Sequence, residues 1–392
     1  MKIDVFAENG KDMAALGASF EAWLGQYDRA PDFVALHKSV ACRDAGLSPR
    51  LADVRALHGA TSCLGVMSEA GPKIENGAGA FAIWDEGGDY GTVMRPLGDD
   101  ARAAARDACE AALLAADRPG EAPDLIWLSS SPGQEEAVLA GIADVVGPHV
   151  PVLGGSAADD SVEGHWLVYD KDDVQSNGVV VSVLFPTTTV SFAYHNGYAP
   201  TEHVGKVTGV EGRLLTEIDG KPAADVYRAW TDHNLIPDAV SETTAILSES
   251  TLAPFGRYLD SVGDVPYYLL AHPAGLTADG HLELFSDVNL GDELTLMSGS
   301  PDQLTQRAGK VAALAVQAGG MSPDSVAGAL CVYCGGCMLA VRNRLDEVAE
   351  GVAKALPSVP FLGVFTFGEQ GVVLDGNNRH GNLMISAVLF GK

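Results

Sequence analysis

The sequence predicts an α/β protein in which duplicated strand-helix-strand units form layered sheets, with a more β-rich segment in the middle. The first observation is that residues 124–156 and 328–366 follow the same plan. Each stretch is an apolar run that stops at small residues, a helix with one apolar face, and a second apolar run that stops at glycine. The second observation is the alternating, turn-rich sequence between them, which is typical of β-structure. A repeated supersecondary unit of this kind indicates an ancient duplication.

Apolar spacing predicts the elements of the first half in order. Residues 12–26 have the period of a helix, and the short apolar run 33–37 predicts a strand. Residues 57–71 form a glycine-punctuated strand and turn that loosely resembles the end of the second copy. An alanine-rich stretch predicts a helix over 101–116, and residues 135–146 carry apolar side chains on one face, as a helix that covers a sheet does.

The second half repeats these helices. Apolar residues over 304–314 match the alanine-rich helix, and those over 345–356 match the helix at 135–146. The repeated unit is therefore helix, strand, helix, strand, which suits an α/β layered architecture.

The middle of the chain differs in character. Two β-runs, 178–185 and 187–194, flank Pro186, and further strands are predicted over 267–270 and 281–285. This change places a domain boundary near residues 186–200. We predict an N-terminal domain of residues 1–190 and a C-terminal domain of residues 191–392.

Composition excludes several classes of protein. The chain has 25 Lys plus Arg against 52 Asp plus Glu, a formal charge of -27. Binding to nucleic acid or to an anionic membrane relies on cationic side chains, so we expect neither partner. No secretory leader and no membrane-spanning run is visible, which predicts a cytoplasmic protein. The six cysteines do not form a disulfide framework, and reduced thiols are expected.

The two copies differ most in their reactive residues. The serines at 129–131 in the first copy correspond to Cys334 and Cys337 in the second, which places Ser130 and Cys334 in roughly equivalent positions. Only the second copy continues into Glu369 and His380. Because α/β sheets bind ligands outside strand ends, we expect a ligand between the two halves of the chain. The predicted ligand-binding residues are Cys334, Gly335, Gly336, Arg342, Gly154, Gly155 and Ser156.

The spacing of Cys331, Cys334 and Cys337 invites a metal interpretation. Strand alternation would point Cys331 and Cys334 to opposite faces, and no further Cys pair or His cluster completes four ligands, so we predict no metal site. Cys337 precedes a helix that begins near Ala340, where the helix dipole favours a thiolate. Cys337, His380 and Glu369 could therefore form a catalytic set. The alternative is that Cys337 packs in the core, Glu369 caps a turn and His380 lies in a surface loop.

The chain resembles the FIST family, the sensory domains named for F-box and intracellular signal transduction proteins. The resemblance rests on residues 152–159, on 207–210, on 217–223 with Tyr227, and on 363–371. It implies an intracellular small-molecule sensor, usually of amino acids. Some members bind haem, sense nitric oxide and regulate a partner histidine kinase or cyclic-dinucleotide enzyme. The family has Cys-Gly-Arg where this chain has Cys334-Gly-Gly, and Arg342 or Arg344 could replace that arginine.

Three functional hypotheses follow. The first is a FIST-type protein that binds a small polar metabolite such as an amino acid and signals through a separate partner. The second is an enzyme with a Cys/His/Glu site. The third is a haem-based nitric oxide sensor, which rests on the resemblance alone because no histidine spacing singles out a haem ligand. The sequence leaves the ligand, the cofactor and the oligomeric state open, and a homo-oligomer is possible.

Overall fold

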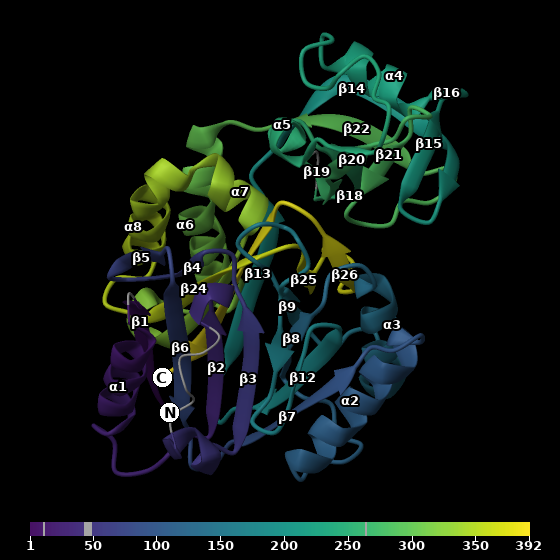
Figure 1. Ribbon diagram of the computed structural model, residues 1–392. Helices are drawn as coiled ribbons and strands as arrows, with labels where there is room; N and C mark the ends of the chain where they lie inside the picture. The colour runs from purple at the N-terminus through teal and green to yellow at the C-terminus, as the bar shows by residue number, and fades with distance from the viewer. Residues whose placement is uncertain (11, 43–48, 263–264) are drawn as a thin grey trace.

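The computed structural model describes residues 1–10, 12–42, 49–262 and 265–392. It has three six-stranded sheets and one nine-stranded sheet, with helices on the outside of the six-stranded ones (Figure 1). The fold is α/β, as the sequence predicts, with repeated strand-helix-strand units and a separate β-rich segment.

The repeat occurs three times rather than twice. Each repeat contributes a first strand, a parallel pair of strands, a short hairpin and a last strand. The first repeat contains β1 (Lys2–Asn9), α1 (Met13–Leu24), β2 (Phe33–Lys38), η1 (Val40–Cys42), η2 (Pro49–Asp53), β3 (Ala56–Thr61), β4 (Gly65–Ser68), β5 (Gly71–Ile74) and β6 (Gly77–Trp84). The second contains β7 (Asp89–Pro96), α2 (Ala101–Ala115), β8 (Leu125–Ser130), α3 (Glu135–Val146), β9 (Val152–Ser156), β10 (Val168–Tyr169), β11 (Val174–Gln175) and β12 (Gly178–Phe185).

The third repeat is interrupted by a large insertion after its first strand. It contains β13 (Val190–Asn196), α6 (Pro301–Ala318), η3 (Pro323–Ser325), β23 (Val326–Cys334), α7 (Gly335–Ala340), η4 (Arg342–Arg344), α8 (Leu345–Ala355), β24 (Phe361–Thr366), β25 (Glu369–Val372), β26 (Asn378–Gly381) and β27 (Met384–Gly391). The predicted division at residue 190 falls at the start of β13, between the second and third repeats.

The inserted domain, residues 199–298, forms the nine-stranded sheet at the top of Figure 1. It contains β14 (Ala199–Glu211), β15 (Leu214–Ile218), β16 (Lys221–Pro222), α4 (Ala223–Trp230), β17 (Thr244–Ala245), α5 (Leu247–Ser250), β18 (Phe255–Val262), β19 (Val265–Ala271), β20 (Pro273–Leu276), β21 (Leu282–Leu284) and β22 (Glu293–Ser298). It has its own buried cluster, which includes Tyr227 and Phe255. We call the three repeats together the body.

The repeats exchange their hairpins in a cycle. The hairpin of the second repeat joins the first sheet through β10 and β3, that of the third joins the second sheet through β25 and β9, and that of the first joins the third sheet through β4 and β24. One hydrophobic core receives side chains from all three sheets, including Phe33, Trp127, Leu330, Val364 and Phe390. This exchange makes the three repeats one pseudo-threefold unit.

Candidate functional site

Strand register shows which residues are equivalent in the three repeats. A glycine of the second parallel strand lies opposite a residue of the first parallel strand in each repeat. The pairs are Gly59 with Leu36, Gly154 with Leu128, and Gly363 with Cys331. Counting three residues on from Leu36, Leu128 and Cys331 gives Ser39, Ser131 and Cys334, which are therefore equivalent in the three repeats. The register aligns Cys334 with Ser131, so the predicted rough equivalence of Ser130 and Cys334 holds to within one position.

These three equivalent residues have different surroundings. Ser39 donates from Oγ to Asp160 Oδ2 at 2.7 Å, and Ser131 donates from Oγ to the carbonyl of Ser176 at 2.9 Å. Both hydroxyls therefore hold loops in place. The Cys334 thiol instead lines a cavity. The third repeat is thus the one in which this position faces open space.

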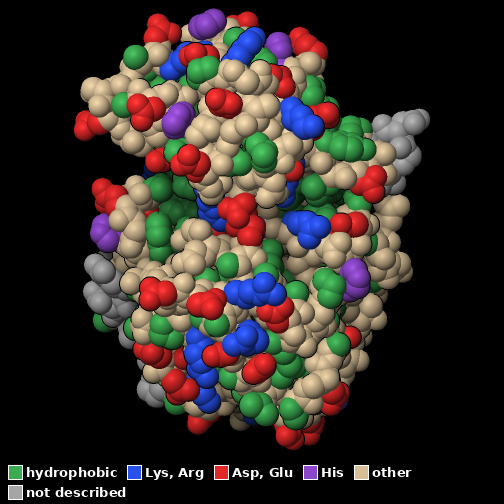
Figure 2. All heavy atoms as spheres, turned by 90° about the vertical axis from the view of Figure 1, so that its right-hand side faces the viewer, with side chains coloured by type: hydrophobic (Ala, Val, Ile, Leu, Met, Phe, Trp, Pro, Cys, Tyr) green, Lys and Arg blue, Asp and Glu red, His purple; other side chains and the backbone are tan. Residues whose placement is uncertain are grey.

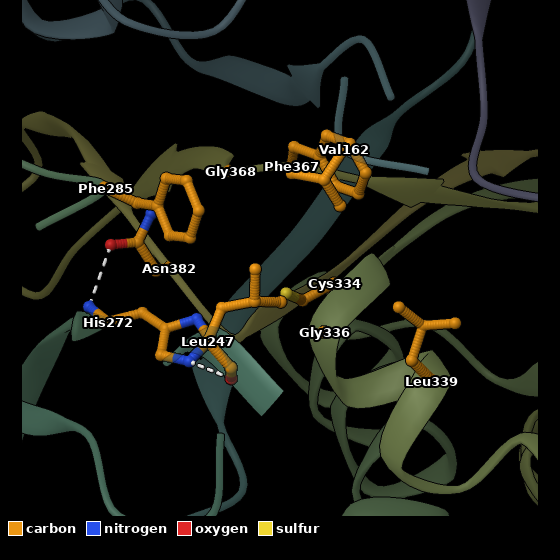
Figure 3. Close-up of a pocket in the computed structure, with 10 residues that line it drawn as sticks. All are labelled: Val162, Leu247, His272, Phe285, Cys334, Gly336, Leu339, Phe367, Gly368 and Asn382. Carbon is orange, nitrogen blue, oxygen red and sulfur yellow. Dashed lines mark hydrogen bonds between the residues drawn. The ribbon is translucent and has the colours of Figure 1, made fainter. Parts of the chain in front are cut away.

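The cavity lies between the inserted domain and the body and measures about 410 Å³ to its open mouth. The surface narrows to a notch between the two parts, with hydrophobic side chains inside (Figure 2). Figure 3 shows the residues that line the cavity. They are Val162, Leu247, His272, Phe285, Cys334, Gly336, Leu339, Phe367, Gly368 and Asn382.

His272 is a neutral hydrogen-bond acceptor in this cavity. Its Nε2 lies 3.0 Å from the carbonyl of Leu247, so that nitrogen carries the proton and donates it. Burial lowers the pKa of His272 to about 4, which keeps the ring neutral at physiological pH. The unprotonated Nδ1 has no hydrogen bond to any residue that the structure describes, and it can accept one from a ligand.

Asn382 and Cys334 supply two donors. The Asn382 side-chain oxygen accepts from the backbone N–H of His272 at 3.1 Å, and its side-chain NH₂ has no hydrogen bond within the described chain. Burial, and next the neighbouring Cys337 thiol, raise the pKa of Cys334 well above its usual range, so the group is a thiol and not a thiolate. The lining offers an acceptor, an amide donor and a thiol. None of the lining residues carries a charge.

One wall of the cavity is a loop held by a buried carboxylate. Asp159 accepts hydrogen bonds from the backbone N–H groups of Ser161, Val162, Glu163 and His165. Val162 has a φ of 60°, which is uncommon for a β-branched residue. Residues held in such conformations cluster at ligand sites. The loop is therefore fixed with the Val162 side chain against the cavity.

The three residues of the predicted catalytic set have different hydrogen-bond partners. The Glu369 carboxylate is buried and accepts from Thr366 Oγ1 at 2.7 Å, from Met384 N at 2.9 Å and from Gly368 N at 3.3 Å. Burial, with a smaller contribution from Cys334, raises the pKa of Glu369 well above its usual value. Glu369 thus fastens β25 to the start of β27.

Cys337 and His380 have other partners. The helix α7 begins at Gly335, not near Ala340, so Cys337 lies inside its first turn, and the buried thiol is 3.6 Å from Tyr198 Oη. His380 lies in β26 and is buried, with Nδ1 3.1 Å from Gln370 Nε2 and Nε2 3.3 Å from the carbonyl of Phe285. No hydrogen bond between described residues joins any two of Cys337, His380 and Glu369.

The predicted ligand-binding residues fall into three groups. Cys334 and Gly336 line the cavity, and a Cβ on Gly335 would lie 3.1 Å from the Phe367 ring beside it. Gly154, Gly155 and Ser156 lie in β9, which pairs with β25 behind the cavity. Arg342 is half-exposed and pairs with Glu75 at 2.8 Å, away from the lining.

A charged cluster beside the cavity was not predicted from the sequence. Carboxylate oxygens of Glu135 and Glu136 and a ring nitrogen of His380 lie within 4.8 Å of one another, which could suit a metal ion. However, Arg213 of the inserted domain lies 2.7 Å from Glu135 and 2.6 Å from Glu136. Its guanidinium supplies the cation and links the inserted domain to α3. Of its members, only His380 was named from the sequence, and the paired glutamates at the start of the helix at 135–146 were the other available sign.

The cavity does not fit haem. A haem group needs an axial ligand and partners for its two propionates. His272 Nδ1 and the Cys334 sulfur are the atoms of the lining that could bind iron, but the lining has no cationic side chain for a propionate. The described residues of this cavity therefore do not support the haem hypothesis.

The fold and the cavity define a class: an α/β protein of three repeats with an inserted β domain and an uncharged cavity between the two. The chain belongs to the FIST family. Its residues 33–221 match the FIST N domain and residues 223–372 match the FIST C domain. None of the helices in the described parts of the chain is long and apolar enough to cross a membrane.

Two curated relatives and two solved structures are similar to parts or all of the chain. The uncharacterized protein MJ1623 of Methanocaldococcus jannaschii is 35% identical over 88 residues, or 22% of this chain and 17% of that protein. The uncharacterized protein Mb0898c of Mycobacterium bovis is 25% identical over 237 residues, or 60% of this chain and 59% of that protein. This chain thus spans less than two thirds of either relative.

Among solved structures, a cyanuric acid hydrolase described as an evolutionary innovation by structural concatenation matches 100% of this chain and 99% of its own, at 11% identity and a TM-score of 0.34. The enzyme of the same name from A. caulinodans gives 9% identity and a TM-score of 0.36 over the same shares. Both scores are too low to carry an argument.

Proposed function

We propose that this protein binds an uncharged, largely apolar small molecule in the cavity between its inserted domain and its body. The observation that carries the proposal is the difference between three equivalent positions. Ser39 and Ser131 bond to the protein and do not line the cavity, whereas the Cys334 thiol, although it also contacts Cys337, lines the cavity together with His272 and Asn382.

The lining favours a neutral ligand over the amino acid that the family resemblance implies. A free amino acid carries an ammonium and a carboxylate, and burying either without a partner costs several kcal/mol or more. The ten lining residues offer no opposite charge. A ring or chain with one donor and one or two acceptors would satisfy His272 Nδ1, the Asn382 NH₂ and the Cys334 thiol, while Phe285, Phe367 and Leu247 cover its apolar part.

A charge series on one ring size tests this proposal. Benzamide, benzoate, benzylamine and phenylalanine share a phenyl ring and differ in charge, and saturation-transfer NMR reports contact with the protein. We expect signals for benzamide that Leu339→Trp removes, because Leu339 is 39% exposed at the cavity mouth. Leu290→Trp is the matched control, since Leu290 is 70% exposed and lies outside the lining. Preferential binding of phenylalanine would favour the amino-acid hypothesis instead.

We propose further that a separate signalling protein responds to the change in conformation that ligand binding causes. The cavity has one wall on the inserted domain and one on the body, so a ligand that contacts both walls shifts the balance between their arrangements. Hydrogen exchange of residues 199–298 with and without bound ligand measures this coupling. Equal exchange in both states would argue against a conformational signal.

The enzyme hypothesis now rests on Cys334 rather than on Cys337. Cys334 is the cysteine that lines the cavity, and a neutral histidine stands in the same lining. The raised pKa of Cys334 opposes thiolate formation in the ligand-free protein, which favours binding over catalysis.

A further inference from the structure

A second, larger groove lies where two unpaired sheet edges meet. β13 and β19 are edge strands of their sheets, and both contribute to the groove together with β25 and α6. The groove measures about 1080 Å³ to its open mouth, and its walls include Phe192, Tyr194, Tyr267 and Leu314. It shares no lining residue with the Cys334 cavity.

The walls of the groove are apolar and partly open to solvent. Leu314 and Leu374 are 39% and 47% exposed, although large apolar side chains are usually covered. The Tyr267 hydroxyl donates to the carbonyl of Tyr194 at 2.8 Å, which turns its polar end into the protein. The groove therefore presents aromatic rings and aliphatic side chains to whatever enters it.

Arg307, an arginine with no ion pair to a described residue, lies on α6 near the groove, although it is not one of the lining residues. Arg307 and Leu314 are seven residues apart on α6, so they lie on the same face of the helix about two turns apart. The Arg307 side chain packs against Gly197, directly after β13, and its Cβ would lie 3.3 Å from a Cβ at that glycine. Arg307 interacts electrostatically with Tyr267 and His195, which both line the groove.

The Arg307 guanidinium has no anionic partner. No described carboxylate forms an ion pair with it, and its Nε is buried without a hydrogen bond. In a chain of net charge -27, most arginines have acidic neighbours. A buried N–H of a charged group that lacks a partner is costly, and a carboxylate is the group that satisfies a guanidinium best.

His195 offers a second donor beside Arg307. Its Nδ1 lies 2.8 Å from the backbone N and 3.0 Å from the backbone carbonyl oxygen of Asn196, and the tautomer with the proton on Nε2, in which Nδ1 accepts from that N–H, is the one that can donate to a ligand. Burial, and next the positive charge of Arg307, lower the pKa of His195 to about 4.

We propose that this groove binds a carboxylate with an apolar body, with the carboxylate at Arg307 and His195 and the body along Tyr267, Phe192 and Leu314. The ligand class differs from that of the Cys334 cavity, which has no charge in its lining. The groove is thus a second site, and the proposal for it does not depend on ligand binding in the Cys334 cavity.

Calorimetric titration with four probes tests the proposal. Decanoate and 1-naphthoate supply an aliphatic and an aromatic body, and decanamide and 1-naphthamide are their neutral counterparts. We expect saturable binding of at least one carboxylate, and Arg307→Gln should weaken it by about tenfold or more while changing the amide by less than about twofold. The preferred carboxylate then identifies an aliphatic or an aromatic body.

Two further variants keep the test independent of folding. Leu314→Asp places a charge on an exposed helix position and should abolish carboxylate binding by repulsion. Arg344→Gln removes an exposed arginine that pairs with Asp302 and Glu347, and should leave binding unchanged. Circular dichroism confirms that each variant is folded. The proposal is overturned if neither carboxylate binds saturably to the wild-type chain, or if Arg307→Gln leaves carboxylate binding intact.

Discussion

Arg213 of the inserted domain and Glu135 at the start of α3 form an ion pair of 2.7 Å, with the glutamate side chain only 1% exposed. Glu135 also accepts from Ser156 Oγ at 2.8 Å, and Arg213 continues to Glu136 and Asp287. The pKa of Glu135 is held below its usual value against the opposing effect of burial, with His380 and Arg213 as the causes. This cluster fastens the inserted domain beside the Cys334 cavity.

Removing Arg213 should loosen that attachment. Arg213→Met removes the guanidinium from the buried Glu135 carboxylate, which keeps the Ser156 hydroxyl and His380 Nε2 at 3.9 Å, so the loss should be at most the about 3–5 kcal/mol that breaking a buried pair costs. We expect a lower free energy of unfolding in urea and faster hydrogen exchange across the inserted domain. The double variant Arg213→Met with Glu135→Gln should recover much of the loss, because no buried charge is left. An Arg213→Met chain as stable as wild type would show that solvent already screens the cluster.

The Cys334 thiol should react slowly when no ligand is bound. Burial raises the pKa of Cys334 well above its ordinary value, so little thiolate exists at pH 7. Mass spectrometry after iodoacetamide should show labelling at least about tenfold slower than for a free thiol of pKa about 8.5, with a rate that rises with pH. Cys334→Ser identifies the labelled peptide. Fast labelling at pH 7 that a ligand blocks would instead support an activated nucleophile and the enzyme hypothesis.

The sequence predicted the elements whose patterns are local. The helix over 135–146 and the strands on either side appear as expected, because their apolar spacing depends only on which face meets a sheet. The first repeat was not recognised as a copy for a physical reason. The described residues between its parallel strands form the short turns η1 and η2, which have no helical period, and residues 43–48 lie outside the described part of the chain. In the third repeat, the inserted domain separates β13 from α6 and hides the order of elements.

The candidate site was predictable only in part. Cys334 stood out as a cysteine where the first copy has a serine, and it does line the cavity. Leu247, His272 and Phe285 come from the inserted domain, and nothing in their local sequence indicates where that domain docks. The same holds for Arg213, whose partners lie far away along the chain. Contacts between distant elements are set by tertiary packing, which a single sequence does not display.

Buried histidines should make the protein less stable in mild acid. Burial lowers the pKa of His37 to about 3, against about 6.5 in an unfolded chain. Between pH 6.5 and pH 3, His37 is therefore protonated in the unfolded state and neutral in the folded state. The free energy of unfolding falls as the pH falls through this range. His37 alone should cost about 2 kcal/mol at pH 5 relative to pH 8.

Urea unfolding of the wild type and of His37→Leu at several pH values measures the contribution of His37 to the pH dependence of the free energy of unfolding. The variant should show a shallower fall between pH 8 and pH 5, while His165→Leu, which changes a surface histidine, should follow the wild-type slope. Parallel slopes for wild type and His37→Leu would mean that His37 gains its proton in the folded state as readily as in the unfolded one.

Gly154 should tolerate no side chain, because the parallel strands of the second repeat approach too closely there. Its φ is 152°, and a Cβ at this position would lie 1.9 Å from the carbonyl oxygen of Leu128. That oxygen belongs to the backbone of β8 and cannot rotate away, so Gly154→Ala must push β8 and β9 apart. Overpacking of this kind costs about 1–3 kcal/mol or more.

Gly120→Ala is the matched control: its φ is 79° and no atom lies within 4 Å of the added Cβ, so it should cost only about 1 kcal/mol of backbone strain. We expect thermal unfolding to show a much larger loss for Gly154→Ala than for Gly120→Ala. Equal losses for the two variants would mean that the strands can separate freely at this point, and that the glycine does not fix the register which makes Ser131 and Cys334 equivalent.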